Sequence, residues 1–208
     1  MTRFVVVAGG PSTEPVRFRP TPDATIVAAD SGADRAHRAG WPVHHVVGDL
    51  DSVSPDGLAH ARAQGAQVHR HPEDKDASDL ELALRLAIDR GATEIDVVLD
   101  PAGRFDHLLV AAHVLAAEAY ASAVLRAVVG RTRLQVVRGS ATIEGSVGDL
   151  VTIVPIGGPA RVTTTDLSFA LSGEWLQPAS GRGLSNRLAA ASAEVDVLDG
   201  VVLVIQPG

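Results

Sequence analysis

Short runs of apolar residues, each ending at or next to a glycine or an aspartate, recur through the first 129 residues of the chain. The runs are Phe4–Ala8, Thr25–Ala29, Val46–Val47, Glu94–Leu99 and Ala123–Val129. Runs of this kind, separated by helical segments, are typical of buried parallel strands. The pattern therefore predicts an α/β domain with an open, mostly parallel sheet and flanking helices.

Helix signals lie between these runs. Ser54-Pro55-Asp56 places a proline at the first helical position of one helix. Ser78 and Glu81 have the spacing of a capping box, which predicts the start of a second helix. A third helix, rich in Ala and Leu, is predicted from about residue 105 to residue 120.

After Gly130 the pattern changes to short strands separated by turn residues. The predicted strands are Leu134–Val137, Leu150–Val154, Arg161–Thr165, Glu194–Leu198 and Val201–Ile205. Asp199-Gly200 is a strong signal for a two-residue hairpin between the last two. We expect a catalytic α/β domain over residues 1–129 and a small all-β domain over residues 130–208.

Composition excludes several classes of function. The formal net charge is −7 and no run of basic residues occurs, which argues against a nucleic-acid partner or an anionic membrane surface. The chain has no cysteine, so disulfides, thiolate catalysis and Cys-type zinc sites are excluded. No apolar stretch reaches membrane-spanning length without a charge, so a cytoplasmic location is expected.

Aspartates gather where the predicted strands end. Asp30, Asp49 and Asp100 each follow the end of a strand, directly or after one glycine. In open parallel sheets, ligands bind in the crevice beyond the carboxyl ends of the strands. Asp51 lies two residues beyond Asp49, and the segment 74–79, DKDASD, adds further carboxylates next to a helix start.

Close carboxylates repel one another unless a cation lies between them. Hard oxygen ligands favour magnesium or manganese over zinc. Asp76 and Asp79 are three residues apart, so one helical turn would place both on one face. The alternative is a set of unrelated helix caps and turn aspartates.

Two basic residues are candidates for phosphate contacts. Of the 18 basic residues only Lys75 is a lysine, and lysine and arginine are not interchangeable as phosphate ligands. The segment Arg104-Phe105-Asp106-His107 opens the third predicted helix, and a helix N-terminus with an arginine favours anions. Gly9-Gly10 could let the backbone approach a phosphate, although a glycine pair alone is weak evidence.

These segments together resemble the thiamine pyrophosphokinase family. That family carries A-D-x-G-A, G-D-x-D-S, D-K-D-x-T-D-x-E, G-R-x-D-H and a late S-N pair. The matching segments occur here in the same order and at similar spacing: Ala29–Ala33, Gly48–Ser52, Asp74–Glu81, Gly103–His107 and Ser185-Asn186.

The resemblance implies an enzyme that moves a pyrophosphoryl group from ATP to thiamine with Mg²⁺. It implies an ATP-binding α/β domain, a thiamine-binding C-terminal β-sandwich, and a homodimer that holds thiamine between its subunits. Catalytic or metal-binding roles are implied for Asp49, Asp51, Asp76 and Asp79, with Lys75 catalytic as a phosphate contact. Binding roles are expected for Asp30, Asp100, Arg104, Asp106, His107, Phe169, Ser185 and Asn186.

The chain departs from the family pattern at a few positions. Asp100-Pro101-Ala102 replaces a glycine-rich lead, and Ser78 replaces a threonine. Gly183 stands where many members have a serine. Phe169 stands where tryptophan or tyrosine is common, in a segment expected to be a strand, and it would either stack on a substrate ring or pack in a core.

Three other functions fit parts of the pattern. VVGDLDSV at 46–53 is similar to the nucleophile segment of haloacid-dehalogenase phosphatases, but two predicted strands precede it and DKDASD would remain unexplained. A pyrophosphokinase acting on a pterin-like alcohol is a second alternative. A non-catalytic nucleotide or thiamine binder is the third.

Overall fold

The structure is a computed structural model that describes residues 1–74 and 76–208. Contacts divide the chain into two compact units. Unit 1 contains Met1–Val114 and Ser122–Gly130, and unit 2 contains Leu115–Ala121 and Arg131–Gly208. Among the described residues, no helix is long and apolar enough to cross a membrane.

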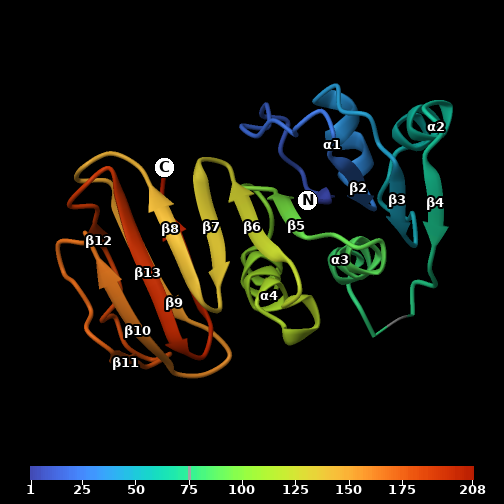
Figure 1. The fold of residues 1–208 in the computed structure, drawn as a ribbon. Coiled ribbons are helices and arrows are strands. Elements are labelled where there is room, and N and C mark those ends of the chain that lie inside the picture. Colours follow the sequence, from blue (N-terminus) through green and yellow to red (C-terminus); the bar gives the residue numbers. More distant parts are fainter. Residues whose placement is uncertain (75) are drawn as a thin grey trace. The chain divides into compact units, whose positions relative to one another are not determined.

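Unit 1 is built on a parallel sheet. Its strands are β1 (Arg3–Ala8), β2 (Thr25–Ala29), β3 (His45–Gly48), β4 (Gln67–Arg70), β5 (Glu94–Leu99) and β6 (Val124–Val129). They are arranged in the order β6-β5-β1-β2-β3-β4, and the pairings between neighbours are parallel (Figure 1). The central strands are buried because both faces of the sheet are covered. The predicted mostly parallel sheet is confirmed.

Helices connect these strands. They are α1 (Gly32–Arg38), α2 (Pro55–Ala63), α3 (Asp79–Asp89) and α4 (Phe105–Leu115). Right-handed crossovers place α1 and α2 on one face of the sheet and α3 and α4 on the other, as Figure 1 shows. The predicted capping box is confirmed, because the Glu81 N–H donates to Ser78 Oγ at 3.3 Å and the Ser78 N–H donates to Glu81 Oε2 at 2.9 Å.

The third predicted helix is shorter than expected. It ends at Leu115, and a separate 3₁₀ turn, η1 (Glu118–Tyr120), follows it. Ala117 adopts an extended backbone, and Arg138 donates hydrogen bonds of 2.7 and 2.8 Å to the carbonyls of Ala116 and Ala117. These carbonyls are thereby satisfied without a further helical turn.

The strand order reverses next to β1. The chain leaves β1 toward β2 and leaves β5 toward β6, so the two connections run in opposite directions across the sheet. In doubly wound sheets the ligand crevice lies at this switch point, beyond the carboxyl ends of the strands. A ligand-binding site is therefore expected at the carboxyl ends of β1, β2, β3 and β5.

Unit 2 contains two antiparallel sheets. Its strands are β7 (Thr132–Val137), β8 (Ser140–Glu144), β9 (Leu150–Pro155), β10 (Ala160–Thr165), β11 (Glu174–Leu176), β12 (Asn186–Arg187), β13 (Ser192–Asp199) and β14 (Val202–Gln206). Within the unit the orders are β12-β9-β14-β7 and β11-β10-β13-β8. Buried apolar residues from both sheets form one core cluster, and burial alternates along β10 and β13 as expected for half-buried strands.

The predicted hairpin at Asp199-Gly200 is wrong. β13 pairs with β8 and β10, whereas β14 pairs with β7 and β9, so the two strands belong to different sheets. The chain bends there, where Gly200 has φ +81°. A Cβ at Gly200 would lie 2.6 Å from the carbonyl oxygen of Pro159, so the glycine lets the chain cross between sheets in close contact with that segment.

Candidate active site

Three carboxylates meet at the ends of neighbouring strands in unit 1. Asp30 directly follows β2, Asp49 directly follows β3, and Asp79 is the first residue of α3. One carboxylate oxygen from each lies within 4.8 Å of the other two. We call Asp30, Asp49 and Asp79 the acidic group. The parallel pairing of β2 with β3 brings the first two together, as the sequence predicts for strand-end aspartates.

Asp30 is the buried member of the acidic group, with 6% of its surface exposed. Its Oδ2 atom accepts a hydrogen bond from the Ser52 hydroxyl. Its Oδ1 atom is buried and has no hydrogen-bond partner among the described residues. A buried carboxylate oxygen without a donor is costly unless a ligand completes it.

Gly48 makes this arrangement sterically possible. It has φ +149°, a conformation that residues with a side chain rarely adopt. A Cβ at Gly48 would lie 3.1 Å from the Cβ of Asp30 and 3.1 Å from Oδ1 of Asp79. Because glycine has no side chain, both aspartates can approach the end of β3.

The chemistry of the acidic group fits a hard divalent cation. Three carboxylates this close repel one another, and a cation between them removes the repulsion. An all-oxygen donor set suits Mg²⁺ or Mn²⁺, and the buried Oδ1 of Asp30 offers an oxygen without a competing donor among the described residues. The residues present therefore fit such an ion.

Asp51 and Asp76 lie outside the acidic group. Asp51 is exposed, and its N–H donates to Oδ1 of Asp49 at 3.2 Å. The negative charge of Asp49 raises the pKa of the Asp51 carboxyl above its usual value. Asp76 is exposed and precedes α3, because the extended N-cap Ser78 starts the helix only at Asp79. The prediction that one helical turn places Asp76 and Asp79 on the same face is wrong.

The acidic group borders a cavity of about 680 Å³ in unit 1. Gly9 and Gly10 after β1 line it, and so do Asp30 after β2 and Asp100 after β5. The start of α4 closes another side with Arg104, Asp106 and His107. This volume is in the range of small-molecule sites. Lys75 lies outside the described residues, so its expected phosphate contact stays a prediction.

Asp100 is buried but already hydrogen-bonded. Its Oδ2 atom accepts from the Ser12 N–H and its Oδ1 atom accepts from the Ala102 N–H, both at 2.8 Å. Gly10 packs directly against it, since a Cβ at Gly10 would lie 2.2 Å from Oδ2 of Asp100. These contacts indicate that Asp100 fixes the two loops that follow β1 and β5.

Arg104 is already paired at the cavity rim. Its Nε donates to Oδ1 of Asp106 at 3.1 Å and its Nη2 donates to Oδ2 at 2.5 Å. This two-point hydrogen bond lowers the pKa of the Asp106 carboxyl. His107 donates its N–H to Oδ1 of Asp106 at 3.1 Å. A phosphate that binds Arg104 would share the guanidinium with Asp106.

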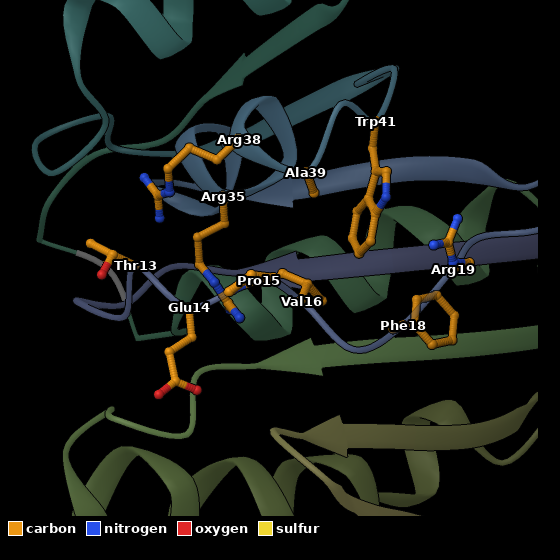
Figure 2. Close-up of a pocket in the computed structure, with 10 residues that line it drawn as sticks. All are labelled: Thr13, Glu14, Pro15, Val16, Phe18, Arg19, Arg35, Arg38, Ala39 and Trp41. Atoms are coloured by element: carbon orange, nitrogen blue, oxygen red, sulfur yellow. The ribbon is translucent and has the colours of Figure 1, made fainter.

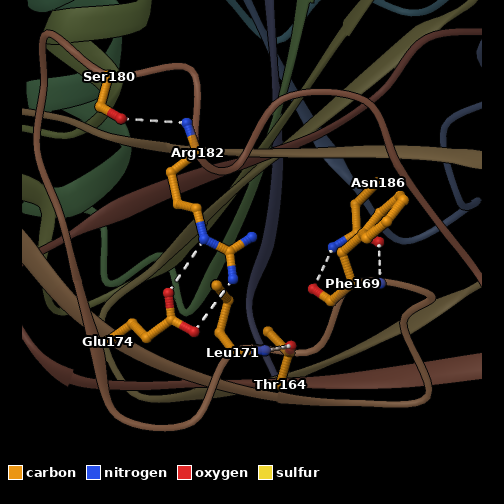
Figure 3. A network of polar contacts seen from close by, with 7 residues as sticks. All are labelled: Thr164, Phe169, Leu171, Glu174, Ser180, Arg182 and Asn186. Carbon is orange, nitrogen blue, oxygen red and sulfur yellow. Dashed lines mark hydrogen bonds and ion pairs between the residues drawn. The ribbon is translucent and has the colours of Figure 1, made fainter.

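In unit 2, the side chain of Asn186 holds the backbone of Phe169. Figure 3 shows the Asn186 carboxamide facing the Phe169 backbone: Oδ1 accepts from the Phe169 N–H at 2.9 Å, and Nδ2 donates to the Phe169 carbonyl at 2.8 Å. Asn186 is 5% exposed and Phe169 is 62% exposed. Phe169 lies in a turn after β10, so its expected place in a strand and the alternative of a core phenylalanine are both wrong.

The remaining unit 2 positions lie beside β9. Ser185 is exposed, has φ +56°, and donates its N–H to Oγ1 of Thr152 at 3.1 Å. Gly183 packs on the backbone, since a Cβ there would lie 2.1 Å from the Ile153 carbonyl oxygen. This contact accounts for a glycine at 183. Arg182 pairs with Glu174 through hydrogen bonds of 3.0 and 3.1 Å (Figure 3).

Comparison with known families gives a match over residues 21–125, slightly more than half of the chain. The matching family is described as thiamin pyrophosphokinase, catalytic domain. The chain belongs to the thiamin pyrophosphokinase family. The matched span contains the acidic group and Arg104, and it ends before Phe169, Ser185 and Asn186.

Solved structures of this family have the same fold. The Bacillus subtilis thiamine pyrophosphokinase is 21% identical with a TM-score of 0.84, and the alignment covers 99% of this chain and 98% of that one. A Geobacillus thermodenitrificans thiamin pyrophosphokinase is 25% identical with a TM-score of 0.82, covering 100% and 98%. A Candida albicans thiamin pyrophosphokinase is 15% identical with a TM-score of 0.79, covering 100% and 89%. Comparison with curated protein sequences gives no match.

The geometry brings together a different set of carboxylates from the set that the motifs indicated, and the assignment of metal ligands stays a prediction. The expected metal ligands were Asp49, Asp51, Asp76 and Asp79, and the structure joins two of them with Asp30 instead of the other two. Asp30 was expected only to bind a ligand. Its position directly after β2 was the available signal, but using it required knowing that β2 and β3 are neighbours.

Proposed function

We propose that this chain transfers a pyrophosphoryl group from ATP to the hydroxyl group of thiamine, giving thiamine diphosphate and AMP. The observation that carries the proposal is the acidic group, which lies at strand ends inside the span that matches the family's catalytic domain. Such transfers depend on positioning and on neutralising charge more than on covalent chemistry with the protein.

Asp30, Asp49 and Asp79 are the residues that would hold Mg²⁺. When bound, the ion would neutralise charge on the polyphosphate. The hydroxyl oxygen of thiamine forms a bond to the β-phosphorus of ATP, the bond from that phosphorus to the α,β-bridging oxygen breaks, and AMP leaves with that oxygen. The backbone at Gly9-Gly10 and the guanidinium of Arg104 line the same cavity and orient the phosphates.

Asp51 is the residue we assign as acceptor of the hydroxyl proton. It is exposed next to the acidic group, and its N–H donates to Oδ1 of Asp49 at 3.2 Å, so its carboxylate lies beside the carboxylates that would hold the ion. Asp76 and Lys75 precede α3 in the same acidic segment and are proposed to act on the phosphates, with Lys75 as a compact positive charge.

Unit 2 is proposed to supply the thiamine-binding side of the site, within a homodimer. The exposed ring of Phe169 offers a stacking surface, and the exposed Ser185 directly precedes Asn186, whose carboxamide hydrogen-bonds the Phe169 backbone. Sedimentation tests the dimer: a fully active monomer would overturn it.

The experiment is a nucleotide-product assay with ATP, Mg²⁺ and candidate alcohols. The proposal expects AMP and thiamine diphosphate in equal amounts and no turnover in excess chelator. Release of inorganic phosphate without AMP would indicate a phosphatase instead. AMP formed with a pterin-type alcohol but not with thiamine would change the substrate, and binding without any product would indicate a non-catalytic binder.

A further inference from the structure

Unit 1 contains a second cavity, of about 560 Å³, between the segment 13–19 and helix α1 (Figure 2). It shares no lining residue with the cavity that borders the acidic group. We call it the arginine cavity, because Arg19, Arg35 and Arg38 line it. Its volume is typical of small-molecule sites.

Positive charge exceeds negative charge in the lining of the arginine cavity, with three arginines and one glutamate. In the part of the chain that the structure describes, none of its three arginines forms an ion pair with a carboxylate, whereas Arg104, Arg126 and Arg182 each do. Glu14 is the acidic lining residue, and in Figure 2 its side chain extends away from Arg38. Concentrated positive charge in a protein of net charge −7 favours an anionic ligand at this place.

Arg35 is a preorganised part of this cavity. It is 5% exposed, and burial together with the charge of Arg38 lowers the pKa of its guanidinium, although Asp100 partly opposes this. The guanidinium donates to the Ala8 carbonyl at 2.6 Å and to those of Val98 and Leu99 at 3.4 Å. A guanidinium has five N–H groups, so donors remain for a ligand after these contacts.

The other end of the cavity is apolar and aromatic. Phe18 and Trp41 meet edge to face, with ring centroids 6.1 Å apart. Figure 2 shows Arg19 beside these two rings, while Arg35 and Arg38 lie toward the opposite end. A ligand that spans the cavity would therefore meet Arg35 and Arg38 at one end, and the two rings together with Arg19 at the other.

We propose that the arginine cavity is a second ligand site that binds a small organic phosphate carrying an aromatic or heterocyclic ring. Arginine binds phosphate through two parallel N–H groups, which suits the phosphate end, and the Phe18–Trp41 surface suits the ring. The same chemistry occurs in a nucleoside monophosphate and in a diphosphate ester of a heterocyclic alcohol. The titration described below distinguishes these two kinds of ligand.

Occupation of the arginine cavity has a consequence at the strand ends. The carbonyls that Arg35 contacts belong to Ala8 at the end of β1 and to Val98 and Leu99 at the end of β5. Gly9 and Asp100 follow these strands and line the cavity that borders the acidic group. A ligand that binds the Arg35 guanidinium therefore changes its contacts with the carbonyls that precede Gly9 and Asp100, which line the cavity beside the acidic group.

Calorimetric titration of the full chain with AMP, thiamine diphosphate and inorganic pyrophosphate tests the proposal. Excess chelator prevents turnover, and the arginine variants described below distinguish binding in the arginine cavity from binding beside the acidic group. We expect one molecule of AMP or of thiamine diphosphate to bind, and the tighter of the two identifies the source. Both should bind at least about tenfold more tightly than pyrophosphate, because pyrophosphate lacks a ring.

Arg38→Gln should weaken this binding about tenfold or more because it removes a phosphate contact, and Arg19→Gln should weaken it less because it removes a cation beside the two rings. Arg62→Gln, at an exposed arginine on α2, should leave the binding unchanged. Arg35 is left intact because it also holds the strand ends. In a Trp175→Phe background Trp41 is the sole tryptophan, so the ligand should change its fluorescence. Absence of binding, or equal binding by wild type and by both variants, would overturn the site. Equal affinity for pyrophosphate would overturn the role of the ring.

Discussion

In unit 1 the buried carboxylate of Asp30 keeps one oxygen without a hydrogen-bond partner among the described residues. In unit 2 the buried carboxamide of Asn186 uses both of its polar atoms on backbone groups of Phe169 and Arg187. Both residues lie in segments that resemble motifs of one family. Asp30 is therefore suited to bind a ligand directly, whereas Asn186 is suited to hold a neighbouring residue in place.

The largest expected effect comes from Asp30. Asp30→Asn keeps an acceptor for the Ser52 hydroxyl but removes the charge from the acidic group. We expect a loss of turnover on the order of a hundredfold or more, as for other preorganised electrostatic groups. Because one repelling charge is removed, the melting temperature in chelator should stay equal or rise, and the increase that Mg²⁺ produces in the wild type should shrink.

Asp56→Asn is the matched control for Asp30→Asn, since Asp56 is an exposed aspartate in the first turn of α2. It should change neither turnover nor the Mg²⁺-induced shift in melting temperature. Wild-type turnover in Asp30→Asn would show that the acidic group does not hold the ion. Asp30 would then not be a ligand-binding residue, and its contrast with Asn186 would not hold.

Asn186→Ala should have a smaller, indirect effect on thiamine. The change leaves the part-buried Phe169 N–H and carbonyl without their partner, which costs on the order of 1 kcal/mol of stability for each lost hydrogen bond. It also frees the turn that presents the Phe169 ring. We expect the KM for thiamine to rise about tenfold in steady-state assays and the KM for ATP to change much less.

Phe169→Ala should raise the KM for thiamine by several-fold at little cost to stability, because the ring is exposed. The double variant with Asn186→Ala shows whether Asn186 acts by positioning Phe169 or by contacting thiamine itself. If Asn186 acts through Phe169, the two effects on the KM for thiamine will not add. Additive effects would mean that Asn186 contacts thiamine itself, and equal effects on both KM values would argue against stacking.

The sequence predicted unit 1 better than unit 2 for a physical reason. Buried parallel strands are continuous apolar runs, so β1, β2, β3, β5 and β6 are visible in the sequence, and the ends of β2, β3 and β5 locate Asp30, Asp49 and Asp100. The short strands β4, β8, β11 and β12 were not predicted, because they are polar or only two to five residues long. Helix α1 is only seven residues long and mostly polar or small in sequence, so it also escaped prediction.

The sequence could not predict which aspartates form the acidic group, for a different reason. Which carboxylates meet depends on the order of strands in the sheet and on the first residue of α3. The spacing of the motifs indicates neither the strand order nor the first residue of α3. The same limit applies to the hairpin at Asp199-Gly200, where the local turn signal holds but the partners of the two strands lie elsewhere in the sequence.

The two units also differ in how they should respond to acid, because all eight histidines lie in unit 1. His45, at the start of β3, is the one with the most defined contacts. Its Nε2 lies 3.1 Å from Nη1 of Arg90, and its Nδ1 lies 3.2 Å from Nε2 of His69. Since a guanidinium only donates, Nε2 of His45 accepts, and Nδ1 carries the hydrogen that is donated to His69.

Burial, followed by the charges of Arg90, His69 and His44, lowers the pKa of His45 to about 4. In the unfolded chain a histidine has a pKa of about 6.5. Between these values the unfolded state binds more protons, so the free energy of unfolding should fall as pH falls from about 6.5 toward 4 and stay level above 6.5. We expect a loss on the order of 1 kcal/mol by pH 5, measured by urea unfolding.

His45→Gln should reduce this acid sensitivity, because glutamine can accept from Arg90 and donate to His69 without titrating. A smaller part should remain, since burial and Arg90 also lower the pKa of His69. His113→Gln, at an exposed position on α4, should behave as wild type. Hydrogen exchange at pH 5 should show the loss in unit 1 and not in unit 2, which has no histidine. If wild type and His45→Gln lose the same free energy of unfolding between pH 6.5 and 5, another group causes the acid sensitivity. His45 would then not explain a difference between the two units.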